Sequence, residues 1–570
     1  MNWKYMILLL QLAGISASCQ KSAVSEMPKN EENKEAVDPE LAKTIGFFIE
    51  NWEEKSFDVP ESQEVQNSFG ANIKVEVDAA EILTKIPNSV YGHNANIWMS
   101  RMIDQPLFMQ HITALRPNLI RWPAGSGSDA YFWNAEPGNL PDDVPKQLVD
   151  QNGQKQEPGY GYGKTEDNWR ASLQDYYDML ATSGNQGVIT VNYGYARYGL
   201  SEDPVARAAQ LAADWVRFDK GRTKYWEIGN ENFGAWEWGY RIDTLSNRDH
   251  QPEFINGTLY AKHFQVFADS MQKAAAEMGT TIHIGAVLFD NAAEEVWQTP
   301  TTKNWNRGLL EHIAGAADYY VVHNYFTPYQ ENSAPEVITD AALLVPQEMM
   351  QFIKGQMSQY AGEIRPLAMT EWNMWAEGSK QQVSNVSGQF ATLVVCEAIR
   401  NQYAAALRWD LLNSWAEGND HGLFSDGREP NVAKWTPRPS FYYLYFLQKM
   451  MGDRLVSTAF DATETRVKAY ASSFSSGELG VVLVNTTTED LPVKIEPKNH
   501  KLGEKYYWYS LQGDTDNIPF SRKVLVNNIG PAGLAGGPEE YEEIKAFTAS
   551  SAAGVKVKVP ARGAVFMVLE

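Results

Sequence analysis

The sequence predicts an α/β chain in which a closed barrel of eight parallel strands and eight helices is followed by a β-sandwich. Between about residues 90 and 453, short apolar runs alternate with segments of helical periodicity, as in parallel sheets that are buried on both faces. After about residue 454, strands with alternating polar and apolar residues are separated by Gly, Asn and Ser turns. The chain has 570 residues, which is enough for one large barrel and one accessory domain.

The barrel region contains eight candidate strands, which is the number that closes a (β/α)8, or TIM, barrel. One earlier segment, residues 72–77, alternates like the C-terminal strands, so we expect this N-terminal strand to join the sandwich. The expected barrel strands are residues 90–98, 118–125, 187–194, 224–231, 281–288, 319–325, 366–373 and 406–413. The expected helices are residues 106–115, 171–183, 205–219, 259–277, 308–314, 344–360, 390–403 and 439–451.

The N-terminus has the features of an export signal. Lys4 precedes an apolar run at residues 6–15 that is too short to span a bilayer, and small residues follow at 16–18. We therefore predict a signal peptide at residues 1–18. Small residues immediately before Cys19 resemble the lipobox of bacterial lipoproteins, which predicts lipidation of Cys19 and a periplasmic or outer-membrane lipoprotein. Ordinary secretion is the alternative.

A linker is expected between this anchor and the folded domains. Residues 20–38 are rich in Lys, Glu, Ser, Asn and Pro and contain few large apolar groups, which is typical of a stalk. Leu41, Ile45, Phe48 and Trp52 then recur at the spacing of one short amphipathic helix. The expected plan is a lipid-anchored linker with a short helix at 19–70, the N-terminal sandwich strand within 71–87, the barrel at 88–453 and the sandwich at 454–570.

The composition excludes some partners. A net charge of -22 would repel nucleic acid and anionic lipid, so we expect no nucleic acid and no membrane contact other than the lipid anchor. Aromatic residues make up 12% of the chain and include 18 Trp, and we expect some of them to line a groove. Apart from Cys19 only Cys396 is present, so the mature chain has no intramolecular disulfide.

Two acids lie at the ends of predicted strands. Glu231 ends the fourth barrel strand after Asn230, and Glu371 lies near the end of the seventh, two residues before Asn373. In such barrels the chemistry occurs at the carboxyl ends of the strands. Cleaving a glycosidic bond with retention needs one protonated carboxyl group and one carboxylate nucleophile, about 5 to 5.5 Å apart. Two acids on different barrel strands can meet this need, although such acids are also common helix N-caps.

Five segments strengthen this interpretation, because together they resemble the retaining glycoside hydrolases of clan A. The resemblance is greatest to family 51, typified by α-L-arabinofuranosidases, and it covers roughly residues 72–570, with specific motifs only in the barrel. The segments are residues 73–98, Val191-Asn192-Tyr193-Gly194, Ile228-Gly229-Asn230-Glu231 with Gly234-Ala235-Trp236, His323-Asn324-Tyr325, and Glu371-Trp372-Asn373-Met374-Trp375.

The resemblance implies that Glu231 is the general acid/base and Glu371 the nucleophile. It also implies that Asn230 bonds the sugar 2-hydroxyl, a contact that strengthens in the transition state. We expect Arg121 and Tyr325 to donate to the nucleophilic carboxylate and keep it ionised. For Arg121, the alternative is a structural salt bridge inside the mouth of the barrel.

Other residues are weaker candidates. His323 is expected to hold the acid or to contact the sugar, with a structural histidine as the alternative. Glu227 shares the strand parity of Glu231 but lies deeper, which predicts a structural pair with a basic group. Glu237 and Asp410 are further candidates for substrate contact. Asn192 and the strand-end indoles of Trp98, Trp122, Trp133, Trp236, Trp372 and Trp415 are candidates for sugar binding, with packing as the alternative.

Two features depart from family 51. Its first strand usually carries a Glu shortly after the Gly, and counting from Gly92 the matching position here is Asn96, which we keep as a candidate for substrate binding. The segment at residues 121–126 also differs from the usual Pro-Gly-Gly-Asn, and the insertion that extends to about Asn168 offers room for new subsites. Both features put an arabinofuranose substrate in doubt.

The expected function is retaining hydrolysis of a plant or algal poly- or oligosaccharide by two Glu, in the manner of an arabinofuranosidase. An endo-acting hydrolase of the same clan, of agarase/porphyranase, galactanase or xylanase type, is the first alternative. A non-catalytic glycan-binding lipoprotein is the second, although it predicts the loss of an acid that the chain retains. The nine His show no zinc spacing, and neither a phosphate loop nor a Ser elbow is recognisable, so no metal and no cofactor are expected.

Overall fold

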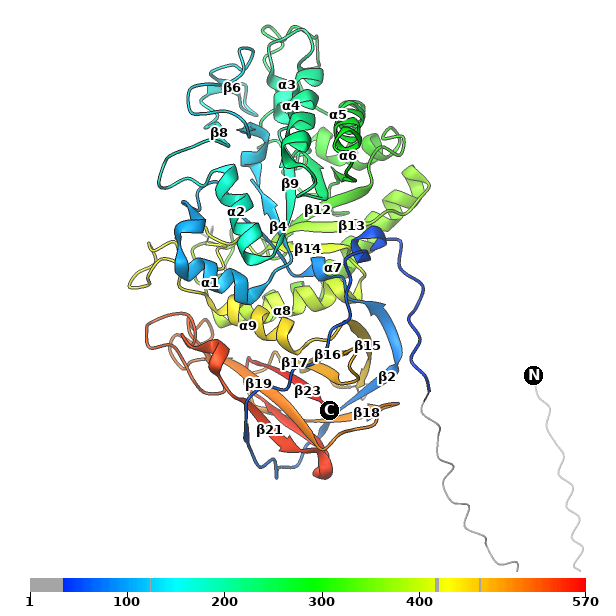
Figure 1. The fold of residues 1–570 in the computed structure, drawn as a ribbon, viewed down its shortest axis with the longest axis vertical. Coiled ribbons are helices and arrows are strands. Elements are labelled where there is room, and N and C mark those ends of the chain that lie inside the picture. Colours follow the sequence, from blue (N-terminus) through cyan, green and yellow to red (C-terminus); the bar gives the residue numbers. More distant parts are fainter. Residues whose placement is uncertain (1–33, 124, 416–419, 461–462) are drawn as a thin grey trace, which may run out of the picture.

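The computed structural model describes residues 34–123, 125–415, 420–460 and 463–570. The signal peptide, Cys19 and most of the expected stalk lie outside the described residues. A barrel and a sandwich lie one above the other, with helices α8 (Asn385–Arg400) and α9 (Pro439–Met450) between them (Figure 1). The fold class predicted from the sequence is confirmed.

The barrel is closed by eight parallel strands that follow one another in chain order. Every segment expected as a barrel strand overlaps one, because buried apolar runs bounded by turns are a strong local signal. The last strand pairs with the first, and Leu407 lies beside Gly92 at this junction. The strands are β3 (Gly92–Asn94), β4 (Leu119–Trp122), β9 (Gln186–Val191), β10 (Tyr225–Ile228), β11 (His283–Val287), β12 (Tyr319–Tyr325), β13 (Leu367–Asn373) and β14 (Ala405–Arg408).

Helices surround the barrel, and two differ clearly from expectation. A helix expected at 308–314 instead begins at Pro300, because the hydroxyl of Thr299 accepts a hydrogen bond from the Thr302 amide and Pro300 suits the first helical turn. The helix expected from residue 344 begins earlier, also at a proline, Pro335. The remaining helices are α1 (Pro106–Leu115), α2 (Leu173–Ser183), α3 (Gly194–Tyr198), α4 (Pro204–Asp219) and α5 (Gly257–Glu277), beside α6 (Pro300–Leu310) and α7 (Pro335–Gln356).

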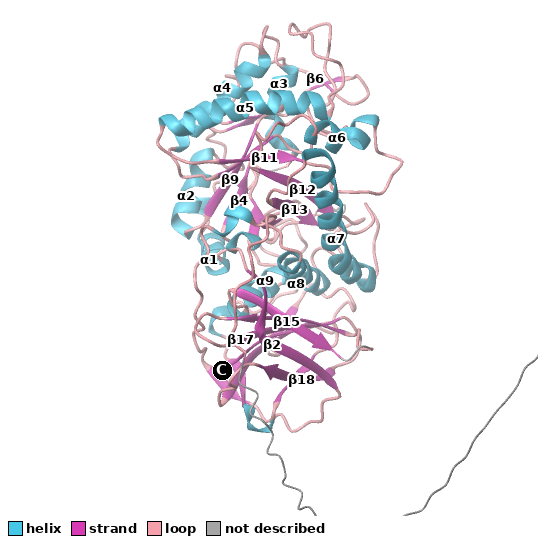
Figure 2. Cartoon of the chain, turned by 90° about the vertical axis from the view of Figure 1, so that its right-hand side faces the viewer, coloured by secondary structure: helices cyan, strands magenta, loops and turns pink. Residues whose placement is uncertain are grey.

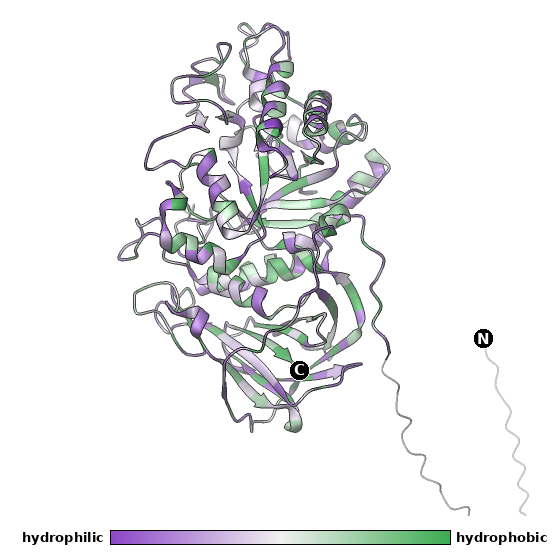
Figure 3. Ribbon diagram, viewed as in Figure 1, coloured by the Kyte–Doolittle hydropathy of each residue, from purple (hydrophilic) through white to green (hydrophobic). Residues whose placement is uncertain are grey.

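The C-terminal strands form one curled sheet that also takes the N-terminal strand β2 (Ile73–Lys85), between β15 and β18 (Figure 2). Val75 and Val77 of β2 are buried in its core together with Val456. Apolar residues lie along the strands of both domains (Figure 3). The other strands of this sheet are β1 (Ser62–Glu64), β15 (Arg454–Phe460), β16 (Val467–Ser473), β17 (Leu479–Asn485), β18 (Leu491–Lys498), β19 (Lys505–Gly513), β20 (Val524–Val526), β21 (Ala546–Ser550), β22 (Val555–Val559) and β23 (Ala564–Leu569).

The described part of the expected linker contacts both domains, because β1 pairs with β21 of the sandwich and an earlier turn packs against the barrel. Its expected helix is a single 3-10 turn, Gly46–Ile49, and Phe48 is only 4% exposed. The Phe48 ring lies 4.4 Å from Tyr225 and 5.3 Å from Tyr319, which begin two barrel strands, so this turn covers the amino-terminal end of the barrel. Gly46 has φ +52, and a Cβ there would lie 2.5 Å from Pro366, so the close approach requires glycine.

The insertion after β4 forms two short ladders, β5 (Tyr131–Phe132) with β8 (Gly161–Tyr162) and β6 (Leu148–Val149) with β7 (Lys155–Gln156). It lies at the carboxyl end of the barrel, on the side where the candidate acids are found. Within the described ranges, no helix combines the length and apolar composition that crossing a membrane requires.

Candidate active site

Glu231 and Glu371 meet at the carboxyl end of the barrel. Glu371 lies within β13, and Glu231 follows β10 after a turn in which Gly229 has φ +77 and Glu231 itself has φ +43. A Cβ at Gly229 would lie 2.1 Å from the Asn232 side-chain oxygen, so only glycine fits there. One carboxylate oxygen of each Glu lies within 4.8 Å of the other and of a His323 ring nitrogen.

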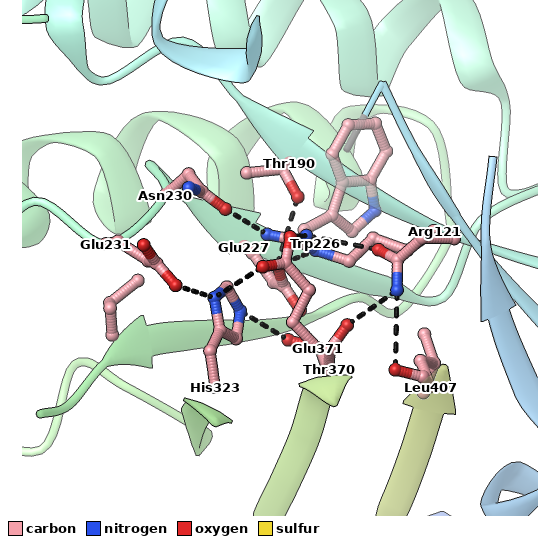
Figure 4. Close-up of polar contacts among 12 residues, drawn as sticks. Arg121, Thr190, Trp226, Glu227, Asn230, Glu231, His323, Thr370, Glu371 and Leu407 are labelled. Atoms are coloured by element: carbon pink, nitrogen blue, oxygen red, sulfur yellow. Dashed lines mark hydrogen bonds and ion pairs between the residues drawn. The ribbon is translucent and has the colours of Figure 1, made fainter. Parts of the chain in front are cut away.

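His323 links the two acids. Strands β12 and β13 place His323 directly beside Glu371 in register. Its Nδ1 lies 2.9 Å from Oε1 of Glu231 and 3.4 Å from Oε2 of Glu371, and its Nε2 lies 3.1 Å from the Thr370 hydroxyl (Figure 4). The ring is thus held from both sides, with one nitrogen facing both carboxylates.

Arg121, on β4, is the cation of the site and is fully buried. Its Nε donates to Glu227 over 2.6 Å, and its two terminal nitrogens donate to Glu371 over 3.3 Å and to the Asn230 side-chain oxygen over 2.8 Å (Figure 4). The predicted pairing of Glu227 with a basic group is therefore confirmed. Arg121 forms a structural salt bridge and contacts the nucleophile candidate at once, so both interpretations offered by the sequence describe it.

Each catalytic candidate has a further donor. The Tyr325 hydroxyl lies 3.4 Å from Oε2 of Glu371, and the Trp236 indole donates to Oε2 of Glu231 over 3.0 Å. Two neighbours orient the Asn230 side-chain amide. Arg121 has only donors, so it must face the amide oxygen, and the amide nitrogen donates to Glu237 over 3.0 Å. The site therefore holds its acids in fixed orientations.

Charge and burial shift the pKa values of the two acids and of His323. Burial raises the pKa of Glu231, but the hydrogen bonds from His323 and Trp236 and the positive charges of His323 and Arg121 together outweigh it, so this pKa lies below its usual value. Burial raises the pKa of Glu371. Burial lowers the pKa of His323, but the negative charge of Glu371 and the bond to Glu231 outweigh it and raise this pKa. The two neighbouring carboxylates thus favour the protonated form of His323.

Asn96 is fully buried, and its side-chain nitrogen donates to Oδ2 of Asp410 over 2.9 Å and to the Leu412 carbonyl over 2.8 Å. An acid at position 96, as in family 51, would lie directly against the Asp410 carboxylate. Two carboxylates at that distance repel strongly. The Asn96 amide instead donates to Asp410, whose pKa is raised well above its usual value by burial.

The other candidates are placed differently. The structure does not place Trp372 at the sugar, and it corrects that prediction. Trp372 is 1% exposed and packs on Phe390 of α8, because neighbouring residues on a strand face opposite sides and Glu371 takes the inner side. Asn192 is 5% exposed, and its side chain is bonded to the backbone of Tyr131 and Tyr195 and to the Tyr198 hydroxyl.

The remaining indoles have separate surroundings. Trp98 is half-buried and donates to the Leu412 carbonyl over 3.1 Å. Trp415 is half-buried and directly precedes residues that the structure does not describe. Trp122 and Trp133 pack against Tyr176 and Trp215 respectively. Of the indoles named from the sequence, Trp236 is the one in hydrogen-bond contact with a catalytic candidate.

Several residues that shape the site could not be predicted from the sequence. Asp129, in the insertion after β4, is buried and accepts hydrogen bonds from the Asn232 side chain over 2.7 Å and from the Asn230 amide over 3.4 Å. Burial raises the pKa of Asp129 to about 7. Thr370 orients His323. A single Asp in a loop and a Thr inside a strand carry no local signal of these roles.

One group of three residues in the described part of the chain could also hold a metal ion, namely Glu231, His323 and Glu371. The guanidinium of Arg121 already places a positive charge 3.3 Å from Glu371. A second fixed cation there would be repelled by the first. The donor set therefore fits a metal ion poorly.

Comparison with known proteins identifies the fold. No protein-family model and no curated protein matches the sequence. Solved structures do match: an α-L-arabinofuranosidase from Thermotoga maritima in complex with arabinose has a TM-score of 0.59 at 17% identity, covering 87% of this chain and 99% of the other. The chain has the clan A glycoside hydrolase fold.

Two further structures agree with this assignment. The thermostable family 51 α-L-arabinofuranosidase from Thermotoga petrophila RKU-1 has a TM-score of 0.60 at 17% identity, with 88% and 100% of the two chains covered. A family 44 xyloglucanase from Paenibacillus polymyxa has a TM-score of 0.54 at 12% identity, with 88% and 100% covered. The fold is thus shared by enzymes whose names state different substrates, and the two arabinofuranosidases have higher TM-scores than the xyloglucanase.

Proposed function

We propose that this protein is a retaining glycoside hydrolase in which Glu231 is the general acid/base and Glu371 the nucleophile. The observation that carries the proposal is the approach of the two carboxylates to within 4.8 Å on the fourth and seventh strands of a barrel. Retaining enzymes hold their carboxyl groups about 5 to 5.5 Å apart, whereas inverting enzymes separate them by about 6.5 to 9.5 Å to admit a water. The clan A fold supports the same assignment.

The proposed reaction has two steps. Glu371 attacks the anomeric carbon while the Glu231 proton passes to the leaving oxygen, so the glycosidic bond breaks as the glycosyl–Glu371 bond forms. Water then attacks the same carbon and gives its proton to Glu231, which releases the sugar and restores both acids. Arg121 and Tyr325 stabilise the Glu371 carboxylate between turnovers, and Asn230 is oriented to bond the 2-hydroxyl.

The proposed substrate is a plant or algal polysaccharide. The family 51 structures favour α-L-arabinofuranosides, and the family 44 structures together with Asn96 favour an endo-acting hydrolase as the second candidate. Cys19 is proposed as the lipid anchor of an exported protein, with secretion as the alternative. Radiolabelled palmitate should enter the wild-type chain in cells and should not enter Cys19→Ala.

The activity is tested by incubating the protein with 4-nitrophenyl α-L-arabinofuranoside, arabinan, arabinoxylan, galactan, agarose and xyloglucan. We expect wild type to release reducing sugar from at least one of these substrates and Glu371→Ala to release none. Long oligosaccharide products would favour the endo candidate over the arabinofuranosidase. Binding of a glycan without release of any sugar by wild type would favour the non-catalytic lipoprotein and reject the enzyme.

A further inference from the structure

Three large aromatic side chains are exposed around Glu231. Trp236 is 48% exposed, Trp297 is 44% exposed and Tyr329 is 64% exposed. They come from the loops that follow β10, β11 and β12, three neighbouring strands of the barrel. Side chains of this size are normally covered, and a group of them beside the candidate acids indicates a ligand surface. We call these three residues the aromatic collar.

The collar rests on a buried aromatic layer. Phe233 and Phe289 are 4% and 7% exposed, and their rings lie 5.1 Å apart. Trp236 packs on Phe233 with ring centres 6.2 Å apart, and Trp297 packs on Phe289 with ring centres 5.9 Å apart. The two exposed indoles lie 5.5 Å from each other. The exposed rings are therefore held in place before any ligand binds.

The two oxygens of Glu231 show which side of the scissile bond the collar occupies. Oε1 faces His323, the ring that also contacts Glu371, whereas Oε2 accepts the hydrogen bond from Trp236. The sugar that is attacked must lie over Glu371. Trp236 therefore bonds the Glu231 oxygen that does not face His323. A leaving group that Glu231 protonates would extend past this oxygen, toward Trp236.

Tyr329 extends the collar on the next loop. Its ring lies 5.1 Å from that of Trp375, which in turn lies 5.3 Å from Tyr325, the neighbour of Glu371. Burial and the negative charge of Glu231 both raise the pKa of Tyr329, which places its hydroxyl within electrostatic reach of the acid. Tyr329 is therefore the exposed end of a row of rings that begins at the half-buried Tyr325.

We propose that the aromatic collar is a leaving-group subsite that binds at least two sugar residues of an uncharged glycan by stacking, an inference that rests on the proposed hydrolase function. Indole and phenol rings match the apolar faces of sugar rings. Glu294 and Glu295 lie in the same loop as Trp297, with Glu295 bonded to the Trp297 indole over 2.6 Å. Glu294 is paired with Lys303 over 2.8 Å, so the charge of Glu295, together with the net charge of -22, is what would repel sulfated or uronic sugars.

The test compares wild type with Trp297→Ala, because Trp297 contacts Trp236 and not the catalytic carboxylates. Phe218→Ala is the matched control, since Phe218 is 43% exposed on the outer helix α4. On the polysaccharide that wild type cleaves, we expect Trp297→Ala to lower kcat/KM about tenfold, as loss of a binding hot spot does. On the matching 4-nitrophenyl glycoside, whose leaving group ends at Trp236, we expect less than about a twofold change.

Equal losses on both substrates, or no loss on the polysaccharide, would overturn the proposal. Affinity electrophoresis in gels that contain the polysaccharide separates this outcome from failure of the enzyme function itself. If wild type hydrolyses nothing, retardation that is weakened in Trp297→Ala and kept in Phe218→Ala would still support the collar, while unchanged retardation would reject it. Retardation by polygalacturonate as strong as that by the neutral glycan would refute the preference for uncharged glycans.

Discussion

Glu231 and Glu371 both lie beside one nitrogen, His323 Nδ1, which is hydrogen-bonded to Glu231 over 2.9 Å and lies 3.4 Å from Glu371. This contact lowers the pKa of Glu231 and, through the charges of the acids, raises the pKa of His323. The proposed acid must nevertheless donate a proton once substrate is bound. We therefore expect His323 to hold that proton before substrate binds. We expect it to pass the proton to Glu231 when a sugar excludes water.

His323→Gln should shift the pH profile of activity upward. Burial raises the pKa of both acids, and the His323 imidazole lowers the pKa of each. Removing the imidazole should therefore leave both pKa values higher. The acidic limb of kcat/KM reports ionisation of the nucleophile and the alkaline limb reports loss of the acid's proton. Both limbs should move to higher pH, with a loss of at least about tenfold at the optimum. Limbs that stay in place while the rate falls would show that His323 has only a structural role.

Arg121→Met should destabilise the fold as well as the active site. Arg121 and Glu227 are both fully buried and 2.6 Å apart, so the variant leaves an unpaired buried carboxylate at a cost of about 3 to 5 kcal/mol. The double variant Arg121→Met/Glu227→Gln removes that charge and should recover most of the urea unfolding free energy. It should not recover kcat, because Glu371 and Asn230 still lack their donor. Recovery of both quantities would contradict the dual role of Arg121.

His111→Gln should change how stability depends on pH. His111 is 4% exposed, its Nδ1 lies 3.0 Å from the Tyr541 hydroxyl, and burial lowers its pKa to about 4. Below about pH 6.5 the unfolded chain binds a proton that the folded chain does not, so folded wild type loses stability as the pH falls. The loss from this residue is about 2 kcal/mol between pH 6.5 and 5.

The glutamine variant lacks this dependence. The stability difference between wild type and His111→Gln should therefore shrink by about 2 kcal/mol from pH 6.5 to pH 5 in urea unfolding. His312→Gln, at an exposed position, is the control and should follow wild type at every pH. Parallel curves for wild type and His111→Gln would mean that His111 becomes protonated without cost in the folded state.

The barrel could be predicted from the sequence because each strand is a local apolar run between turns. The segment around Phe48 could not, since its burial depends on Tyr225 and Tyr319, which lie far away in the sequence. The start of α6 could not be predicted because the residues after Pro300 are mostly polar. Its cap becomes evident in the structure, where the Thr299 side chain accepts from the Thr302 amide.

The site was predicted to a similar extent. Glu231 and Glu371 lie in conspicuous segments at strand ends, and closure of the barrel brings them together as expected. Packing, the alternative given for the strand-end indoles, describes Trp372, because period-two alternation turns its side chain away from Glu371. Trp297 and Tyr329 belong to loops without a repeating pattern, so only the folded chain shows them beside Glu231.

The assignment of two different roles to Glu231 and Glu371 is tested most directly by azide rescue. Glu231→Ala should retain measurable activity on substrates with activated leaving groups, because the nucleophile is intact and such groups need no proton. Azide should accelerate this variant and yield a glycosyl azide, whereas Glu371→Ala should remain inactive with or without azide. Equal losses that azide does not relieve in either variant, or rescue of Glu371→Ala alone, would contradict the assignment of Glu231 as acid/base and Glu371 as nucleophile.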